Sequence, residues 1–271
     1  MTGWLIYDPK GAERNAWFAA ALIQAAKKNG MELQLKISPD LDRLDGSPDR
    51  PDFAVVRAIC PDYNRHLEAM GIPVFNNAAT AAAANDKWKT YQLCRSLHIP
   101  VLPTAPAENS ALFRRELGYP FAAKSRDGHG GSEVFCIQNE DQWNTLAGAV
   151  NLSRFIVQQF CTDPGKDMRV YALGDRIPAG MIRTSETDFR SNYSLGGRAE
   201  QGDVTENQRA VVRKLKEALN FDFIGADFIV QNGRWMLNEI EDPVGTRMLY
   251  AMTDLDPAAM MMDYIAGRLK K

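Results

Sequence analysis

The sequence predicts an α/β protein, more closely α+β, with a small parallel sheet near its N-terminus and an antiparallel sheet near its C-terminus. Three observations predict this. Over residues 1–77, short apolar runs alternate with helical patterns, an order that favours an open parallel sheet covered on both faces. Over residues 121–137, two strand patterns flank a glycine-rich segment. From Met168 onward, strand patterns follow one another around a single long helix.

The first unit is predicted to span residues 1–77. A strand is expected to stop at a turn over Asp8–Gly11, because Pro and Gly end regular structure. Apolar residues at helical spacing then predict a helix that ends at Gly30. In chain order, the expected elements are the strand Trp4–Tyr7, the helix Asn15–Asn29, the strands Leu33–Ile37 and Phe53–Arg57, the helix Tyr63–Met70 and the edge strand Pro73–Phe75.

The second and third units are predicted to span residues 78–157 and 158–271. The elements expected in the second are the helix Asn85–Leu97, the short strand Val101–Leu102, the strands Phe121–Lys124 and Glu133–Ile137, and a strand from Phe155 to Phe160. Those expected in the third are the strands Arg169–Leu173, Ile177–Ile182, Phe228–Val230 and Trp235–Glu239, the helices Glu206–Leu219 and Pro257–Leu269, and a polar loop over Thr184–Asp203.

Composition excludes several classes of protein. Of 271 residues, 45% are hydrophobic, and the formal charge of −2 gives no general attraction to nucleic acid or to an anionic membrane. The four cysteines form no CxxC pair, which argues against a zinc site or a disulfide framework. The start lacks a signal-peptide pattern, and no apolar run is long enough to span a bilayer. We therefore expect a soluble cytoplasmic protein, whose methionine-rich last helix suits either a core or the interface of a homo-oligomer.

The segment Ser125–Ser132 is a candidate anion-binding loop. Its three glycines, Gly128, Gly130 and Gly131, let backbone N–H groups approach an anion closely, and Lys124 just before it adds a point charge for a phosphate. A hairpin that binds nothing explains the glycines equally well. The loop lacks both the Gly-Lys-Ser/Thr ending of a Walker A motif and the helix-opening dinucleotide fingerprint.

Three carboxylates form a candidate metal site. Glu239 and Glu241 are two apart on one predicted strand and so share a face, and Asp227 on the partner strand can lie opposite them. Converging carboxylates repel one another unless a cation lies between them, and Mg²⁺ prefers such oxygen ligands. An exposed acidic strand face is the alternative, and the apolar residues that flank the acids favour the metal.

The edge of the polar loop carries a third group of candidate residues. Arg190 offers a planar fork for phosphate, and Asn192 a neutral ligand or donor. Arg169 and Arg183 add positive charge nearby in the sequence. Taken alone, these residues are more typical of a solvated loop.

Together these segments resemble the ATP-grasp superfamily and, within it, the RimK-like carboxylate–amine ligases. The resemblance covers residues 85–247, and its segments occur in the family's order. They are Asn85-Asp-Lys-Trp-Lys, Ala123-Lys124 with its glycine loop, Phe155-Ile-Val-Gln-Gln-Phe, Lys166-Asp-Met-Arg-Val, Asp188-Phe-Arg-Ser-Asn-Tyr-Ser-Leu-Gly-Gly, Gly225-Ala-Asp and Asn238-Glu-Ile-Glu-Asp-Pro-Val-Gly. It implies an ATP-grasp fold with a pre-ATP-grasp domain, a central lid subdomain and a C-terminal antiparallel subdomain.

The resemblance implies a role for each matching residue. Lys87 and Lys124 would contact the phosphates of ATP, beneath a closing loop that contains Gly128, Gly130 and Gly131. Gln159, Phe160 and Cys161 would form the hinge that meets adenine, and Asp167 would lie near the ribose. Arg190 and Asn192 would act with Lys124 in catalysis, on the γ-phosphate and the reacting carboxylate. Asp227, Glu239 and Glu241 would hold Mg²⁺, or Mn²⁺ in its place.

Two positions depart from the family pattern. Glu241 stands where the family usually has Asn, and Gln159 where it usually has Glu. The additional charge at Glu241 either tightens metal binding or shifts the metal's position. Gln159 costs the hinge little if backbone groups bind the adenine.

The implied activity is an ATP-dependent ligase that joins a carboxylate to an amine through an acyl phosphate, on an amino acid or peptide. Two alternatives are an ATP-grasp kinase of small molecules and a protein that binds ATP without turnover. Arg247 is either a clamp for the substrate carboxylate or a surface arginine, and His129 either touches a phosphate or is solvated. The partners implied are small molecules, with neither nucleic acid nor membrane.

Overall fold

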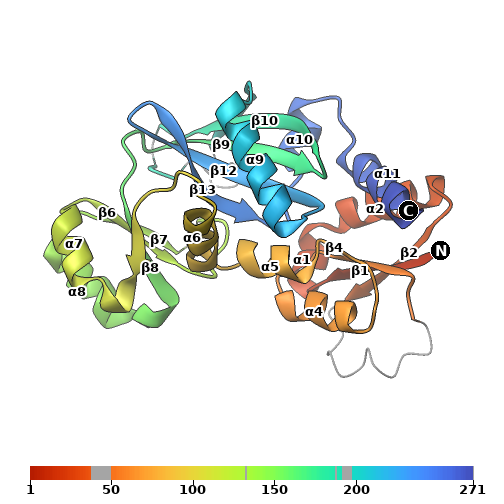
Figure 1. Cartoon of the computed structure of the whole chain (residues 1–271), viewed down its shortest axis with the longest axis horizontal. Helices are drawn as coiled ribbons and strands as arrows, with labels where there is room; N and C mark the ends of the chain where they lie inside the picture. The colour runs from red at the N-terminus through yellow and green to blue at the C-terminus, as the bar shows by residue number, and fades with distance from the viewer. Residues whose placement is uncertain (38–49, 132, 187, 191–196, 271) are drawn as a thin grey trace.

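The computed structural model describes residues 1–37, 50–131, 133–186, 188–190 and 197–270. These residues form three sheets, and the one nearest the C-terminus lies between the other two along the long axis of the molecule (Figure 1). The first sheet is parallel, and the other two are antiparallel. The predicted α/β fold class is confirmed.

The N-terminal sheet has the strand order β2-β1-β3-β4. Its strands are β1 (Thr2–Tyr7), β2 (Glu32–Ile37), β3 (Phe53–Val56) and β4 (Val74–Phe75), and its helices are α1 (Pro9–Arg14), α2 (Ala16–Lys28) and α4 (Pro61–Ala69). Side chains alternate across β1, so that Leu5 packs with Phe18 of α2 on one face, and Ile6 with Leu67 of α4 on the other. Apolar residues on both faces explain why β1 and β3 read as continuous apolar runs.

Helix α1 corrects the predicted turn at Asp8–Gly11. Asp8 caps this helix, because its side chain accepts a hydrogen bond from the backbone N–H of Gly11. Pro9 occupies the first helical position, where its missing N–H costs nothing. The motif that reads as a chain-breaking turn is therefore a helix start.

The middle sheet has the order β5-β8-β6-β7. Its strands are β5 (Thr104–Pro106), β6 (Phe121–Ser125), β7 (Val134–Ile137) and β8 (Phe155–Gln159). Its helices are α7 (Ala111–Leu117) and α8 (Glu140–Ala149), with the short 3₁₀ turns η1 (Ala107–Asn109) and η2 (Leu152–Arg154). Phe121, Trp143 and Val157 lie in the core between sheet and helices. The predicted strand at Val101–Leu102 is reduced to a single bridge from Val101 to Leu237.

The third sheet has the order β11-β10-β9-β12-β13. Its strands are β9 (Lys166–Leu173), β10 (Arg176–Thr184), β11 (Arg198–Gln201), β12 (Phe223–Gln231) and β13 (Arg234–Glu241), and its helices are α9 (Glu206–Leu219), α10 (Arg247–Met252) and α11 (Pro257–Leu269). Strand β11 forms inside the segment predicted as a polar loop. Among the described residues, no helix combines the length and the apolar character that a bilayer span requires.

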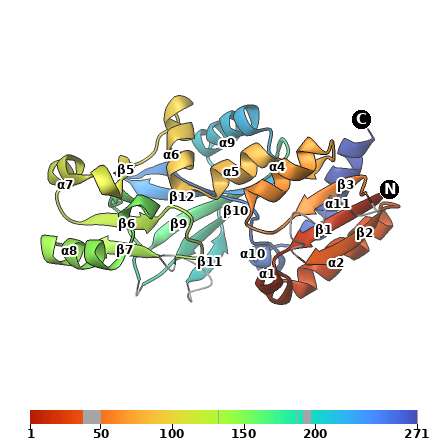
Figure 2. The ribbon, with the colours of Figure 1, turned by 90° about the horizontal axis from the view of Figure 1, so that it is seen from below.

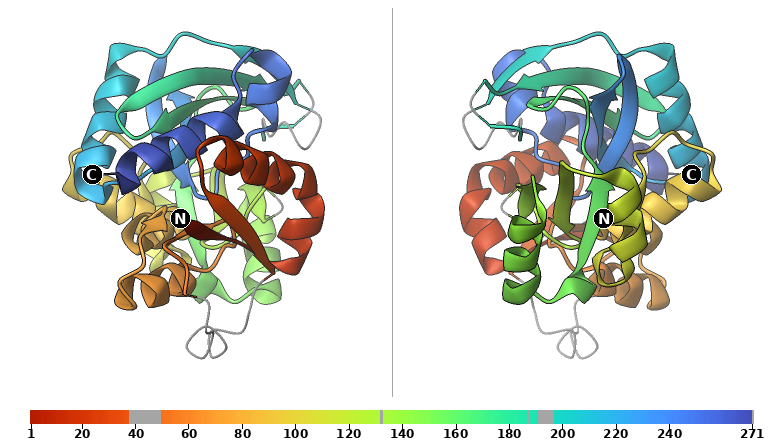
Figure 3. Two further views of the ribbon diagram at one scale, coloured as in Figure 1. Left: turned by 90° about the vertical axis from the view of Figure 1, so that its right-hand side faces the viewer. Right: turned by 90° about the vertical axis from the view of Figure 1, so that its left-hand side faces the viewer.

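Helices from distant parts of the chain cover the two faces of the third sheet. On one face, α9 packs together with α5 (Ala78–Ala84) and α6 (Lys87–Ser96), and Figure 2 shows these three helices along the same side. On the other face, α11 lies against α2 of the N-terminal unit (Figure 3, left). The residues assigned by prediction to the start of the middle unit thus share a core with the third sheet.

Asn76 joins the N-terminal unit to the third sheet. Its side-chain N–H group donates to the carbonyl of Phe223 at 2.6 Å and to Asp242 Oδ1 at 2.8 Å, and its oxygen accepts from the backbone N–H groups of Asp222 and Phe223. The side chain is buried, so these four bonds form away from water.

We expect Asn76→Ala to lower the free energy of unfolding by about 3–4 kcal/mol, because it strands buried polar groups of the partner unit. Urea unfolding followed by circular dichroism measures this. The exposed Asn144 of α8 provides the matched control, Asn144→Ala, which should change stability by less than about 0.5 kcal/mol. Equal stabilities of the two variants would contradict the assigned role of Asn76.

Candidate active site

A cavity of about 400 Å³ is lined by residues of all three units. Such a volume lies within the range of small-molecule sites. The N-terminal unit contributes the ends of β1 and β3 with α1 and α2, the middle unit contributes the β6–β7 hairpin, and the third contributes β9, β10 and β13. Of the residues predicted for the site, those that line the cavity are Lys87, Lys124, Gly128, Gly130, Gly131, Gln159, Phe160, Cys161, Asp167, Arg190, Glu239 and Glu241.

The glycine hairpin tip is held over the cavity by two cations. Gly130 and Gly131 have φ angles of 68° and 77°, which residues other than glycine rarely adopt. The carbonyl of Gly128 accepts a hydrogen bond from Lys87 Nζ, and that of Gly131 accepts one from Arg190 Nη1 at 2.8 Å. Two of the three cations predicted to meet phosphate, Lys87 and Arg190, therefore contact the hairpin backbone.

Lys124 connects the middle sheet to the third. Its Nζ donates to Gln158 Oε1 at 2.6 Å and to Asn238 Oδ1 at 2.9 Å, and both acceptors are neutral amides. Burial lowers the pKa of Lys124 to about 8, although the charge of Glu239 opposes this. A phosphate that entered the cavity would favour the protonated amine and raise this pKa again.

Nucleotide binding at pH 8 is accordingly expected to take up roughly 0.5 proton per site, because about half of the Lys124 amines are neutral in the free protein. Isothermal titration calorimetry with the non-hydrolysable analogue AMP-PNP, in buffers of different ionisation enthalpy, measures how many protons are taken up on binding. Lys124→Arg, which stays protonated, should abolish this uptake. Equal uptake by wild type and variant would show that another group titrates.

The predicted adenine hinge follows β8 directly. The N–H of Gln159 donates to the carbonyl of Pro103, and the ring centroid of Phe160 lies 5.7 Å from that of Phe189. Burial raises the pKa of the Cys161 thiol, which keeps the thiol neutral at physiological pH. This segment forms the wall of the cavity at the junction of the middle and third units.

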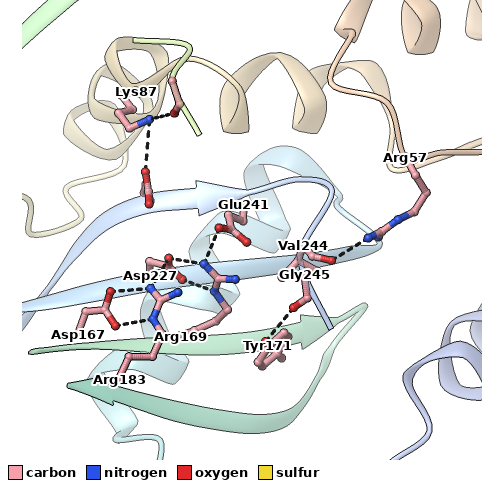
Figure 4. A network of polar contacts seen from close by, with 12 residues as sticks. Arg57, Lys87, Asp167, Arg169, Tyr171, Arg183, Asp227, Glu241, Val244 and Gly245 are labelled. Carbon is pink, nitrogen blue, oxygen red and sulfur yellow. Dashed lines mark hydrogen bonds and ion pairs between the residues drawn. The ribbon is translucent and has the colours of Figure 1, made fainter. Parts of the chain in front are cut away.

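Asp227 lies at the centre of a buried ionic network (Figure 4). Its two oxygens accept a bidentate pair from Arg169 at 2.8 and 2.7 Å and a further bond from Arg183 at 2.8 Å. Arg183 also pairs with Asp167, and Arg169 with Glu241 at 2.5 Å. Burial alone would raise the pKa of Asp227, but the two guanidinium charges outweigh it and bring that pKa to about 2.

These pairings bear on whether the predicted metal ligands suit a cation. Glu239 is half-buried and faces the cavity, with one oxygen 3.5 Å from Lys87 Nζ, so it fits a cation placed there. Glu241 also faces the cavity, but one of its oxygens is already paired with Arg169. Asp227 is 1% exposed and would have to exchange an arginine contact for the ion. No group of three or more His, Cys, Asp or Glu side chains within the described ranges has a metal-binding arrangement. The Asp227, Glu239 and Glu241 site stays a prediction.

Asp227→Asn is expected to destabilise the fold by about 3–5 kcal/mol, because it leaves two buried guanidinium groups short of a counter-charge. Thermal unfolding at pH 7 measures the change. Asp175→Asn, at an exposed turn between β9 and β10, should leave the melting temperature within about 1 °C of the wild type. A stable Asp227→Asn variant would mean that this network contributes little to folding.

The arginine of the polar loop is held in place by its neighbour. Arg190 pairs with Asp188, with Nη2 2.6 Å from Oδ2, while its Nη1 reaches the hairpin. Asn192 lies outside the described residues. Arg247 lines the cavity and donates to the carbonyl of Arg14 at 3.0 Å. His129 also lines it, and burial together with the charge of Lys87 lowers the pKa of this histidine.

Comparison with known proteins gives the family. The model of the RimK-like ATP-grasp domain matches residues 84–265, about two thirds of the chain. The chain belongs to the RimK-like ATP-grasp family. The predicted resemblance is confirmed, and with it the prediction of an ATP-grasp fold.

Two relatives and one solved structure resemble the chain along nearly its whole length. The alpha-aminoadipate–LysW ligase LysX of Saccharolobus solfataricus is 26% identical, covering 94% of this chain and 99% of that protein. A probable alpha-L-glutamate ligase of Mannheimia succiniciproducens is 24% identical, covering 95% and 96%. The RimK domain ATP-grasp protein of Sphaerobacter thermophilus superposes with a TM-score of 0.77 at 21% identity, covering 98% of this chain and 99% of that one.

A further structural neighbour was solved with its nucleotide. The D-alanine–D-alanine ligase of Bacillus anthracis, complexed with ATP, has a TM-score of 0.76 at 14% identity, covering 100% of this chain and 97% of that one. Two predictions from the sequence are thus confirmed: the ATP-grasp fold, and an ATP-dependent enzyme that forms carbon–nitrogen bonds.

Some cavity residues were not singled out by sequence reasoning. Gln158 and Asn238, which bind Lys124, lie inside quoted motifs, but their orientation depends on how two sheets meet. Arg57 lies at the end of a predicted strand. A charged residue directly after an apolar run is the feature of the sequence that could have indicated a place at the cavity.

Proposed function

We propose that this RimK-like protein is a Mg²⁺-dependent cytoplasmic ligase that joins an amino acid or peptide carboxylate to an amine through an acyl phosphate. The observation that carries this is that Lys87, Lys124, Arg190 and Glu239 line one cavity beneath the glycine hairpin. Relatives that are named ligases of amino acids support the substrate class. The cytoplasmic location is supported by the proposed need for ATP, which cells hold in the cytoplasm.

In the first step, a substrate carboxylate oxygen attacks the γ-phosphorus, and the bond from that phosphorus to the bridging oxygen breaks, releasing ADP. Lys124 and Arg190 would offset the charge on the transferred group, which is the main catalytic requirement of phosphoryl transfer. A bound Mg²⁺ ion, held by Glu239 and Glu241 with Asp227 behind them, would neutralise the phosphate oxygens. This step requires no proton transfer from the protein.

In the second step, the amine nitrogen attacks the acyl carbon, the carbon–oxygen bond to phosphate breaks, and the amine loses its proton to the medium. Water would compete by hydrolysing the acyl phosphate. The hairpin tip, tied to Lys87 and Arg190, covers the cavity and would exclude water during this step.

An ADP-release screen over paired carboxylates and amines tests the proposal. We expect ADP release that depends on Mg²⁺ and on both partners, with an amide product detected by mass spectrometry. A phosphorylated product that accumulates without any amine would instead identify a kinase. Tight AMP-PNP binding with no ADP release from ATP across the panel would identify a protein that binds nucleotide without turnover.

A further inference from the structure

One edge of the N-terminal parallel sheet lines the large cavity but holds none of the residues proposed to bind nucleotide. In the order β2-β1-β3-β4, the chain leaves β1 toward β2 on one side and returns to β3 on the other, so the strand order reverses between β1 and β3. Open parallel sheets bind ligands outside the carboxyl ends of strands at such a reversal. Tyr7 ends β1, and Arg57 directly follows β3. Both line the large cavity.

Arg57 is a buried cation whose direct hydrogen-bond partners are neutral groups. Its side chain is 9% exposed, its Nη2 donates to the carbonyl of Val244 at 2.9 Å, and its Nε donates to the hydroxyl of Tyr7 at 3.3 Å. The guanidinium carbon lies 5.1 Å from the centroid of the Phe18 ring. Within the described part of the chain, Arg57 forms no ion pair with a carboxylate.

The carboxylate whose field reaches Arg57 is already engaged. Asp242 accepts a hydrogen bond from Asn76, and with Arg57 it lines both the large cavity and a neighbouring small one without pairing directly with the guanidinium. A buried guanidinium without a direct counter-charge is costly, and its remaining N–H groups match the two oxygens of a carboxylate. Arg57 therefore has both the charge and the free donors to receive an anion from the cavity.

The cavity wall around Arg57 defines the size and the character of such a ligand. Arg14 and Arg247 add positive charge at the rim, where the two residues are joined by a hydrogen bond. Trp17 and Ile59 also line the cavity while remaining 42% and 45% exposed, which leaves apolar surface beside the charges. This end suits a carboxylate attached to a small organic body.

We propose that Arg57, at the β1–β3 reversal, binds the carboxylate of an amino acid that serves as the amine substrate. This carboxylate does not react, and its recognition selects free amino acids over amines that lack the charge. This inference rests on the proposed ligase function and adds to it a residue that determines specificity. Tyr7 positions the guanidinium, and Arg14 with Arg247 raises the local positive potential.

The test compares each free L-amino acid with its C-terminal amide, in the ADP-release assay and with a fixed carboxylate partner. Wild type should use the best free acid at least about 30-fold better in kcat/KM than its amide, because a site built for a charged group rejects the neutral analogue. Arg57→Gln should raise KM for the free acid about 30- to 100-fold, with kcat within about threefold, and should leave the amide nearly unchanged. Arg57→Lys should recover part of the loss.

Further measurements and control variants separate this inference from the proposed function and from misfolding. AMP-PNP binding and the melting temperature report whether Arg57→Gln is folded, and Tyr7→Phe, a milder change to the same site, should raise KM about threefold. The exposed Arg95 of α6 provides the control Arg95→Gln, which should behave as wild type. An unchanged acid-to-amide ratio in folded Arg57→Gln overturns the inference alone. Absence of wild-type turnover with every pair overturns the ligase function, and the inference with it.

Discussion

Lys124→Met is expected to lower ATP-dependent turnover by about 10³-fold or more, because it removes a pre-positioned positive charge from the site of phosphoryl transfer. Methionine is unbranched like lysine and only one heavy atom shorter, so the hairpin strands should keep their packing. The Lys124 amine is tied to both the middle and the third sheet through Gln158 and Asn238. It is therefore held in place before any ligand arrives, and such preorganisation makes a charge effective in catalysis.

The measurement is kcat/KM for ATP from initial rates of ADP release. Lys89→Met, on the exposed side of α6, is the matched control and should retain full activity. Lys124→Met removes two hydrogen bonds to neutral amides and breaks no ion pair among the described residues, so we expect the variant to remain folded. A folded variant with more than about a tenth of wild-type activity would remove Lys124 from the proposed mechanism.

Glu239→Gln is expected to lower turnover by about 10³-fold and to raise the Mg²⁺ concentration required for half-maximal rate, because an amide is a poorer magnesium ligand than a carboxylate. Of the three acids, Glu239 is the one whose replacement best separates an effect on activity from an effect on folding. It is half-buried and contacts Lys87 at 3.5 Å, whereas Asp227 also balances two buried arginines. Replacing Glu239 should therefore change activity with little change in stability.

A magnesium titration at saturating ATP measures this effect. Glu217→Gln, on the exposed face of α9, should give the wild-type curve. If Glu239→Gln showed the wild-type rate and magnesium requirement, the predicted metal site would be wrong. Asp227→Asn alone cannot decide the matter, because loss of folding would mimic loss of metal.

Much of the fold could be predicted because local patterns and tertiary structure agree. Helix α9 begins and ends as predicted, where Thr205 and Gln208 form a capping box and Asn220 ends the helix in the left-handed conformation. Helix α11 also matches, since Asp256 caps it and Pro257 occupies its first position. The turn predicted at Asp8 was wrong because the same Asp-Pro pair starts a helix.

Sequence alone brings together only those cavity residues that lie in one segment. The hairpin glycines and Lys124 are adjacent in sequence, so their common place at the cavity could be predicted, while their chemistry stays a prediction. The pairing of Asp227 with Arg169 and Arg183 joins three strands, and nothing in any one strand indicates it. The role proposed for Arg57 similarly depends on an edge that forms only when β1 and β3 pair.

Hydrogen–deuterium exchange with and without Mg·AMP-PNP tests the central claim most directly, namely that nucleotide lies between the glycine hairpin and the third sheet. We expect amide exchange to slow about tenfold or more in two segments, residues 127–131 at the hairpin tip and residues 159–161 at the hinge. Saturating analogue that leaves both segments unprotected, or that protects a different face of the molecule, would contradict this claim.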